Sequence, residues 1–422
     1  MNKYIKLLLS LTIMFTIGCE DNDDEAGATS VAFDITRIDV KSTGDSDVSQ
    51  PELVRFVSST EGVIVNSKTN SLDFFGISGT GLTMGTASVT LTDDPEGESS
   101  SIDVSVDNSI IAGVVTKGAC AKGELYLVEA ATKTKYGPYQ LGYNPDAVDI
   151  SVDNQYVVVV NEYDYGDGVD GGCDSIARPG VTIYDISGGL GNATLVKDMV
   201  INHTGSNGDL AEPEGVKIAP DGRTVFMTLQ ESNEIGWFDI LSPPDTLVYK
   251  MEFTSVNHKP DGIWVNDAQT YVATAGEIDG QLCVTMLDGP NGAPSTQTYA
   301  NLASDLPSNW TWEDVTKGIE PEEILILDKD DQSFMISTLQ DAGAVVVYNI
   351  TDPMNPVYDS GAISELNDYT QQDGGVSSGE PEGLHYKDGF VLVANTADPS
   401  VCLLYTSPSP RDLSTSRMPS SA

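Results

Sequence analysis

A proline followed by an acidic residue recurs along the chain and could gather carboxylates at one site. The copies are Asn144-Pro145-Asp146-Ala147-Val148, Glu212-Pro213-Glu214-Gly215-Val216, Lys259-Pro260-Asp261-Gly262-Ile263, Glu320-Pro321-Glu322-Glu323-Ile324 and Glu380-Pro381-Glu382-Gly383-Leu384. A fold built from equivalent repeats would bring the acidic residues after these prolines together around one opening. We therefore predict a ring formed by Asp146, Glu214, Asp261, Glu322 and Glu382.

Such a ring needs something to offset its charge. Two carboxylates about 8 Å apart repel by roughly 2 kcal/mol at an effective dielectric constant near 20. The ring must therefore be hydrated, partly protonated or bound to a cation, and oxygen ligands favour Ca²⁺ or Mg²⁺ over Zn²⁺. The alternative is that these acids cap turns and accept hydrogen bonds from backbone amides.

Two further acidic groups are candidate cation ligands. One set follows the second apolar run of each repeat: Glu162, Glu231, Glu277 and Asp341, with Asn395 in the last repeat. Antiparallel strands would return this set to the same rim as the ring. The other set lies in a glycine-rich loop: Asp164, Asp167, Asp170 and Asp174. This loop predicts a calcium site that does not follow the EF-hand spacing, and a flexible acidic loop is the alternative.

Signals for other catalytic chemistry are few. The only histidines are His203, His258 and His385, which argues against a multi-histidine metal centre. His258 precedes one of the proline motifs and is a candidate acid or base at the ring, with a plain loop histidine as the alternative. A Gly-x-Ser-x-Gly string surrounds Ser377 in a polar loop, but it lacks the strand-to-helix turn that makes such a serine reactive.

The elements that position these residues are short strands. Each motif is followed by a polar turn and a second apolar run: Tyr156–Val160, Thr224–Leu229, Tyr271–Ala275, Phe334–Thr338 and Phe390–Ala394. A third run then closes each unit: Val181–Ile186, Ile235–Ile240, Leu282–Leu287, Ala344–Ile350 and Val401–Tyr405. Two less regular units, Leu53–Ile77 and Ser101–Glu129, precede these five. Units repeating about every 50 to 70 residues without helical periodicity predict an all-β, seven-bladed β-propeller.

The ring of blades must also be closed. The seventh unit supplies three strands, and an open ring would leave a bare sheet edge. Val31–Val40 alternates apolar and polar residues with the period of a strand, so we predict that it is the outer strand of the last blade. This gives one propeller domain over residues 30–405. Residues 406–422 are poor in apolar side chains and resemble translated adapter sequence, so we expect a non-native tail there.

The N-terminus resembles a bacterial lipoprotein signal peptide. Lys3 and Lys6 precede the apolar run Leu7–Ile17, and Gly18-Cys19 follows. This predicts a signal peptide over residues 1–18, lipidation of Cys19, an acidic spacer over residues 19–29, and a lipoprotein of the outer membrane or cell surface. The alternatives are an ordinary signal peptide cut elsewhere and a transmembrane helix, which needs roughly 20 apolar residues.

The composition restricts the partners. The 64 Asp and Glu residues outnumber the 21 Lys and Arg residues, and the formal net charge is −43. Such a chain repels nucleic acid and anionic lipid, so we exclude a nucleic-acid partner and expect membrane attachment through the N-terminal lipid. Export would favour a disulfide between Cys120 and Cys173, whereas Cys283 and Cys402 lie in apolar strands; four free thiols are the alternative.

The motifs, in this order, resemble a family of secreted bacterial propellers, the choice-of-anchor I domain proteins. Some members are labelled alkaline-phosphatase-like or mesenchyme-specific cell-surface-glycoprotein-like. The resemblance rests on Asn144-Pro145-Asp146 with Asn161-Glu162, Glu212-Pro213-Glu214-Gly215 with Gln230-Glu231-Ser232-Asn233, Lys259-Pro260-Asp261-Gly262 with Gly276-Glu277, Gly343-Ala344-Val345-Val346-Val347-Tyr348 and Gly379-Glu380-Pro381-Glu382-Gly383. It implies a propeller fold and an exported location.

Two functional hypotheses remain. The first, which we favour from the sequence, is a surface lipoprotein whose propeller face binds a protein or glycan ligand, with Ca²⁺ as a structural ion. The second is a Ca²⁺-assisted hydrolase, a phosphoesterase or lactonase, acting at the acidic mouth of the channel. Few Lys and Arg residues lie near the motifs, which argues against a phosphate substrate.

Overall fold

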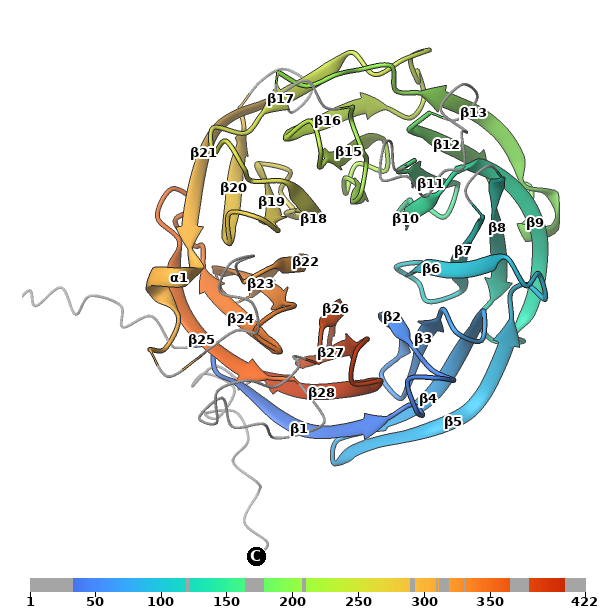
Figure 1. Cartoon of the computed structure of the whole chain (residues 1–422), viewed down its shortest axis with the longest axis horizontal. Helices are drawn as coiled ribbons and strands as arrows, with labels where there is room; N and C mark the ends of the chain where they lie inside the picture. Colours follow the sequence, from blue (N-terminus) through green and yellow to red (C-terminus); the bar gives the residue numbers. More distant parts are fainter. Residues whose placement is uncertain are drawn as a thin grey trace, which may run out of the picture. The chain divides into compact units, whose positions relative to one another are not determined.

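Seven antiparallel sheets of four strands each make up the described part of the chain. The structure is a computed structural model that describes residues 33–118, 121–163, 178–206, 210–288, 293–308, 310, 319–329, 331–364 and 379–406. The sheets surround a common centre, and the innermost strands are β2, β6, β10, β14, β18, β22 and β26 (Figure 1). The predicted seven-bladed β-propeller is therefore confirmed.

The first four blades follow one another along the chain. Their strands are β2 Pro51–Ser58, β3 Glu61–Asn66, β4 Ser71–Ser78 and β5 Gly81–Thr90; β6 Gly97–Val104, β7 Ile110–Lys117, β8 Lys122–Glu129 and β9 Thr134–Tyr143; β10 Pro145–Ile150, β11 Tyr156–Asn161, β12 Gly180–Asp185 and β13 Thr194–Val200; and β14 Val216–Ile218, β15 Thr224–Leu229, β16 Glu234–Asp239 and β17 Tyr249–Glu252. In each of these blades the strands pair in the order of the sequence.

The remaining three blades include the one that closes the ring. Their strands are β18 Pro260–Val265, β19 Tyr271–Gly276, β20 Gln281–Leu287 and β21 Pro294–Asn301; β22 Pro321–Lys329, β23 Gln332–Leu339, β24 Ala344–Asn349 and β25 Val357–Ile363; and β26 Pro381–Lys387, β27 Phe390–Asn395, β28 Ser400–Thr406 and β1 Ile35–Ser42. Helical structure in the described residues is limited to the one-turn helix α1, Leu302–Asp305, and the short 3₁₀ turn η2, Leu190–Asn192. No helix in this part of the chain has the length and hydropathy to cross a membrane.

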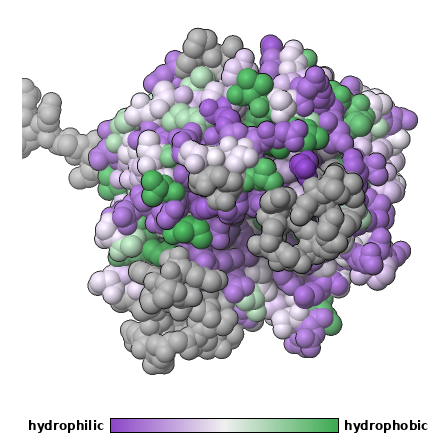
Figure 2. Space-filling view, turned by 45° about the horizontal axis from the view of Figure 1, so that its top comes forward, coloured by the Kyte–Doolittle hydropathy of each residue, from purple (hydrophilic) through white to green (hydrophobic). Residues whose placement is uncertain are grey.

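The hydrophobic core lies between neighbouring blades. Val158 and Val181 of the third blade, for example, belong to one buried cluster with Val225 and Met227 of the fourth. β-branched side chains suit these positions because they pack well on a pleated surface. The face shown in Figure 2 is mainly hydrophilic with scattered hydrophobic side chains, as the high charge predicts.

The glycines of the proline motif allow the innermost strands to approach one another. A Cβ added to Gly215 would lie 2.5 Å from the carbonyl oxygen of Asp261, and one added to Gly262 would lie 2.4 Å from that of Glu322. A Cβ on Gly383 would meet the backbone of Leu53 at 2.7 Å. The glycine in Pro-x-Gly therefore has a steric reason, because any side chain there would push adjacent blades apart.

The N-terminal strand closes the ring as predicted. β1 pairs antiparallel with β28, from Ile35 opposite Thr406 to Ser42 opposite Ser400, so the last blade combines both ends of the described chain. The predicted strand Val31–Val40 thus corresponds to β1, which begins at Ile35 and ends at Ser42. Thr406, the first residue of the predicted tail, is the buried last residue of β28. Residues 1–32 and 407–422, with the predicted signal peptide, spacer and rest of the tail, lie outside the described residues.

The contacts of Phe33, just before β1, indicate how much the closure of the ring contributes to stability. Phe33 is buried, stacks on Phe334 with ring centroids 4.5 Å apart, and receives a hydrogen bond at its carbonyl oxygen from Ser360. We expect Phe33→Ala to lower the free energy of unfolding by about 3 kcal/mol, as measured by urea denaturation, because it leaves a cavity between β1 and the sixth blade. Ile38→Ala, on the exposed side of the same strand, should cost less than about 1 kcal/mol. Equal losses in both variants would contradict this role.

Candidate functional site

The acidic residues after the motif prolines surround one cavity. Asp146, Asp261, Glu322 and Glu382 are each the second residue of an innermost strand, and Glu214 lies just before β14. All five line a cavity of about 460 Å³ among the first strands of the blades. The structure thus brings the predicted ring together at one mouth of the channel, which we call the acidic mouth.

The sequence analysis missed the equivalent positions in the first two blades. Pro51 faces Asn66 as Pro145 faces Asn161, with the same irregularity in register after it, so Glu52 is the sixth carboxylate of the ring. The string Gln50-Pro51-Glu52 has the proline and the acidic residue of the motif, so Glu52 could have been predicted from the sequence. In the second blade the matching residue is Ser100, whose hydroxyl donates to the carbonyl oxygen of Pro145 at 2.9 Å. Glu52 and Ser100 both line the cavity.

The second acidic set is only partly at this site. The amides of Glu162, Gln230, Glu277 and Gln340 donate to the carbonyl oxygen of the residue before each motif proline, which makes these four positions equivalent. The predicted residues Glu231 and Asp341 are therefore one position further along, and Asn395 one position short of Thr396, which occupies this place in the last blade. Glu231 forms an ion pair with Lys259 at 2.6 Å and does not line the cavity.

Two carboxyl groups of the ring share protons with their neighbours. Burial, followed by repulsion from Glu162, Asp146 and Asp261, holds the pKa of Glu214 well above its usual range, and Glu214 hydrogen-bonds to Asp146. Burial and the nearby Asp261 do the same for the pKa of Glu322, which hydrogen-bonds to Asp261. A protonated Glu214 donating to Asp146, and a protonated Glu322 donating to Asp261, satisfy both observations. This is how like charges at short range relieve their repulsion.

The other carboxyls of the ring are also shifted. Burial and then the charge of Asp261 raise the pKa of Asp146 to about 7, and burial and then Glu52 raise that of Glu382 to about 8. The side-chain amide of Gln340 donates to Glu382 at 2.8 Å, which opposes this rise. The pKa of Glu52 is raised by burial as well. The ring is therefore partly protonated near neutral pH.

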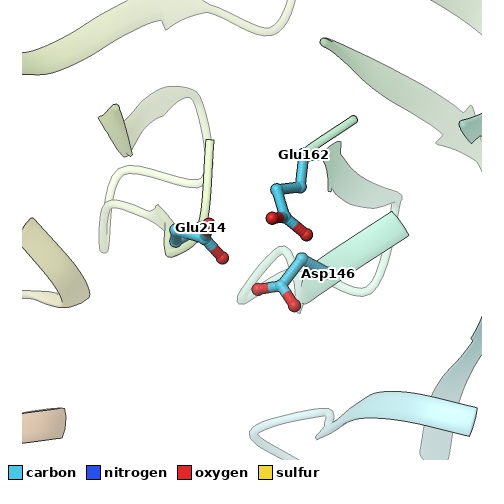
Figure 3. A group of neighbouring side chains, drawn as sticks. All are labelled: Asp146, Glu162 and Glu214. Carbon is cyan, nitrogen blue, oxygen red and sulfur yellow. The ribbon is translucent and has the colours of Figure 1, made fainter. Parts of the chain in front are cut away.

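One group of carboxyls has the spacing of cation ligands. Asp146, Glu162 and Glu214 each offer an oxygen, and these oxygens lie within 4.8 Å of one another. Their carboxyl groups face one another from neighbouring blades (Figure 3). Asn144 fixes Glu162 through a hydrogen bond from its side-chain amide to Oε2 at 2.6 Å. Three carboxyl oxygens and the adjacent polar cavity suit a hard cation such as Ca²⁺ or Mg²⁺.

A layer of ion pairs narrows the channel beneath the ring. Arg55 donates from two nitrogens to Glu323, at 2.6 and 3.2 Å, and lies 3.8 Å from Asp103. Lys217 pairs with Asp149 in the same layer. The carboxylates also accept backbone amides from the next blade: Ile150 donates to Asp103, Ile218 to Asp149 and Leu384 to Glu323. This layer, which we call the waist, ties the innermost strands together and sets two cations, Arg55 and Lys217, against three carboxyl groups.

Other predicted site residues lie elsewhere. His258 is fully buried, contacts Asp279 and Thr274, and packs on Phe253, so it does not reach the acidic mouth. Cys283 and Cys402 are buried free thiols, as their apolar strands indicated, and burial raises the pKa of both to about 12. Several residues of the predicted sites lie outside the described residues: Cys19, Cys120, Asp164, Asp167, Asp170, Cys173, Asp174 and Ser377.

Comparison with known proteins identifies the fold. No family model and no curated protein matches the sequence. Among solved structures, virginiamycin B lyase from Staphylococcus aureus is similar with a TM-score of 0.56 and 11% identity, covering 88% of this chain and 99% of the lyase. The periplasmic gluconolactonase of Pseudomonas aeruginosa matches with a TM-score of 0.56 and 13% identity, over 86% of this chain and 90% of its own. The Cps50 beta-propeller domain of Myceliophteria thermophila matches with a TM-score of 0.57 and 6% identity, over 89% of this chain and 100% of its own.

These identities are so low that the likeness shows the fold alone. The chain is a β-propeller. The neighbours include enzymes, a lyase and a lactonase, and the same fold hosts many unrelated functions. The function must therefore be argued from the site. The resemblance to choice-of-anchor I domain proteins stays a prediction.

The raised pKa values predict how stability depends on pH without added cations. The folded state holds protons on Asp146 and Glu382 up to about pH 7 and 8, whereas the unfolded chain has lost them well below pH 6. The free energy of unfolding should therefore fall as pH rises from 6.5 to 8.5, by up to about 1.4 kcal/mol per pH unit for each such group. Urea denaturation in a chelating buffer measures this slope.

A matched pair of variants tests whether the ring causes the slope. Glu382→Gln imitates the protonated carboxyl and should flatten the pH dependence. Glu231→Gln, which removes an acid outside the cavity, should leave the slope as in the wild type. The pKa of His385 is lowered by burial and by nearby cations, so this residue adds an opposite slope that fades as pH rises above the unfolded value of about 6.5, equally in the wild type and both variants. A slope unaffected by Glu382→Gln would show that the ring is ionised in the folded protein.

Proposed function

We propose that the acidic mouth is the functional site and that it works as a cation-assisted hydrolase site for small, oxygen-rich substrates. The observation that carries this is the group Asp146, Glu162 and Glu214, with oxygens within 4.8 Å at the edge of a cavity of about 460 Å³. A cavity of this size with polar groups and shifted pKa values is the usual setting of a small-molecule site. A bound divalent cation would polarise a carbonyl oxygen of the substrate.

The lining favours a lactone or ester over a phosphate ester. Among the described residues that line the cavity, Arg55 is the only cationic side chain, and its guanidinium is taken up by Glu323. A phosphate substrate would meet mostly carboxyl groups, whereas a neutral lactone carries no charge to repel.

The chain's own carboxyls supply acid and base. Glu322, whose pKa is raised well above its usual range, is held protonated next to Asp261. Two adjacent carboxyl groups of which one keeps its proton can divide the roles of general acid and general base. In ester cleavage Glu322 would donate a proton to the leaving alkoxide oxygen, and Asp261 would accept one from the attacking water. Both residues line the cavity.

Ligand binding without catalysis is the second candidate, and the lining gives it specific support. The described lining holds carboxyl, hydroxyl and amide groups but no histidine. Such a set suits a cation-bridged polyhydroxyl ligand such as a glycan. A panel of lactones, aryl esters and aryl phosphates, assayed with and without Ca²⁺, separates the two functions. Calcium-dependent cleavage of a lactone or ester supports the hydrolase, and calcium binding without any turnover supports the binding protein.

Calcium should stabilise the protein through the acidic mouth. At about 100 times its dissociation constant, Ca²⁺ should raise the free energy of unfolding by about 2.7 kcal/mol. Glu214→Gln removes one charged ligand and should lower the calcium affinity by about tenfold, which halves this gain. Because Asp146 and Glu214 must lose protons to bind the ion, the affinity should rise between pH 6 and 8. Titration calorimetry and urea denaturation measure both effects.

The control for this experiment is Glu231→Gln. Glu231 pairs with Lys259 and is not part of the group Asp146, Glu162 and Glu214, so the variant should keep the full calcium gain. If both variants keep the gain, the ion binds at another place and the proposed site is wrong. If only Glu214→Gln loses it, the group in Figure 3 is the ion site.

We also propose that the protein is exported and anchored by a lipid on Cys19. The N-terminal sequence supports this location, because Lys3 and Lys6 precede an apolar run that ends at Gly18-Cys19. Metabolic labelling with palmitate in a bacterial host should label the wild-type protein, and Cys19→Ala should abolish the label and release the protein from the membrane fraction. Label that persists in the variant would disprove lipidation at this residue.

A further inference from the structure

A second cavity lies at the other mouth of the channel. It has a volume of about 320 Å³ and shares Arg55, Val148, Val216, Ile263 and Glu323 with the acidic cavity. Its remaining lining comes from residues further along the same innermost strands, among them Lys217, Trp264 and Lys387, and from the turns after them. The waist therefore separates the acidic mouth from this cavity, which we call the opposite mouth.

His385 presents a hydrogen-bond donor to the opposite mouth. Its Nδ1 accepts the backbone amide of Phe56 at 2.8 Å, so Nδ1 carries no proton. Burial and the charges of Arg55, Lys217 and Lys387 hold its pKa well below the usual range. The ring is therefore the neutral tautomer with its proton on Nε2. His385 lines the cavity, and its ring also packs on that of Phe56.

Two lysines add positive charge beside this histidine. Lys387 donates to the side-chain oxygen of Asn108 at 3.2 Å and forms no ion pair within the described part of the chain. Lys217 pairs with Asp149 and lies over the ring of Trp264, 4.4 Å from its centroid. Both lysines line the same cavity as His385. An anion here would meet donors from Lys387 and His385 and the charge of Lys217.

The carboxylates of the opposite mouth are mostly occupied. Asp103, Asp149 and Glu323 accept backbone amides from the next blade and neighbour Arg55 or Lys217. Asp267 is the remaining acid in the lining. The outer part of the cavity is apolar, because Val106 and Val152 line it and are 69% and 43% exposed. A ligand would therefore have a charged head and an apolar body.

We propose that the opposite mouth binds a small organic anion, whose carboxylate or phosphate head lies between Lys387, His385 Nε2 and Lys217 and whose apolar body contacts Val106 and Val152. This site differs from the acidic mouth in place and in ligand charge, and it does not depend on the function proposed there. Arg55 and Glu323, which pair with each other, line both cavities.

Titration calorimetry with benzoate and phenyl phosphate tests this site, with benzyl alcohol as the uncharged probe. A chelator in the buffer prevents a cation at the acidic mouth from recruiting the anion. We expect one saturable site for at least one of the two anions and none for benzyl alcohol. Tighter binding of benzoate would assign a carboxylate head, and tighter binding of phenyl phosphate a phosphate head. Binding of neither anion would overturn the proposal.

Three variants assign the binding to the opposite mouth. Lys387→Gln should weaken the binding about fivefold, and Asp267→Asn should strengthen it, because these changes remove opposite charges from the same lining. Lys197→Gln removes a lysine that pairs with Asp245 outside both cavities and should have no effect. Equal affinities in Lys387→Gln, Asp267→Asn and the wild type would place the bound anion elsewhere and refute the site.

Discussion

The close approach of seven inner strands around one axis is the constraint on which the rest of this structure depends. Gly215, Gly262 and Gly383 permit it, because a side chain at any of them would clash with the neighbouring blade. The same approach places the residue before each glycine at the channel mouth, where its neighbours are other acids. The same motif therefore packs the blades through its glycine and concentrates negative charge at the channel mouth through its acidic residue.

The protein neutralises this charge in two ways at two depths. At the acidic mouth, where the cavity leaves room for solvent or ligand, carboxyls keep protons and hydrogen-bond to one another, as Glu214 does with Asp146. At the waist there is less room, and Arg55 and Lys217 pair with Glu323 and Asp149 while backbone amides complete the acceptors. A buried ion pair stabilises little when intact but costs about 3 to 5 kcal/mol when one partner is removed. The waist therefore fixes the relative positions of the blades more than it adds stability.

The features that recur in each blade could be predicted from the sequence. The contacts that join residues of different blades could not. The blades, the closing strand and five of the six ring acids follow from local patterns, because each blade carries its own copy of the motif. Glu52 was missed although its motif was present, and Ser100 carries no motif. Glu231 and Asp341 were placed one residue away from the structural equivalents Gln230 and Gln340, because composition favours an acid over an amide and only the hydrogen-bond register separates them. The pairing of Arg55 with Glu323 joins residues far apart in the chain and leaves no local signal.

The two mouths differ because one position of the inner strands repeats from blade to blade and a position three residues later does not. The residue at the ring position is acidic in six blades. The residue three positions later differs from blade to blade, apart from two blades that both carry Asp: it is Arg55, Asp103, Asp149, Lys217, Trp264, Leu325 and His385 in turn. A residue repeated around an axis gathers groups of the same kind at one opening, and here these groups are carboxyls. A non-repeated set produces an asymmetric surface with distinct donors, which suits an organic molecule with a head and a body. The repeat explains the acidic mouth, and its divergence explains the opposite one.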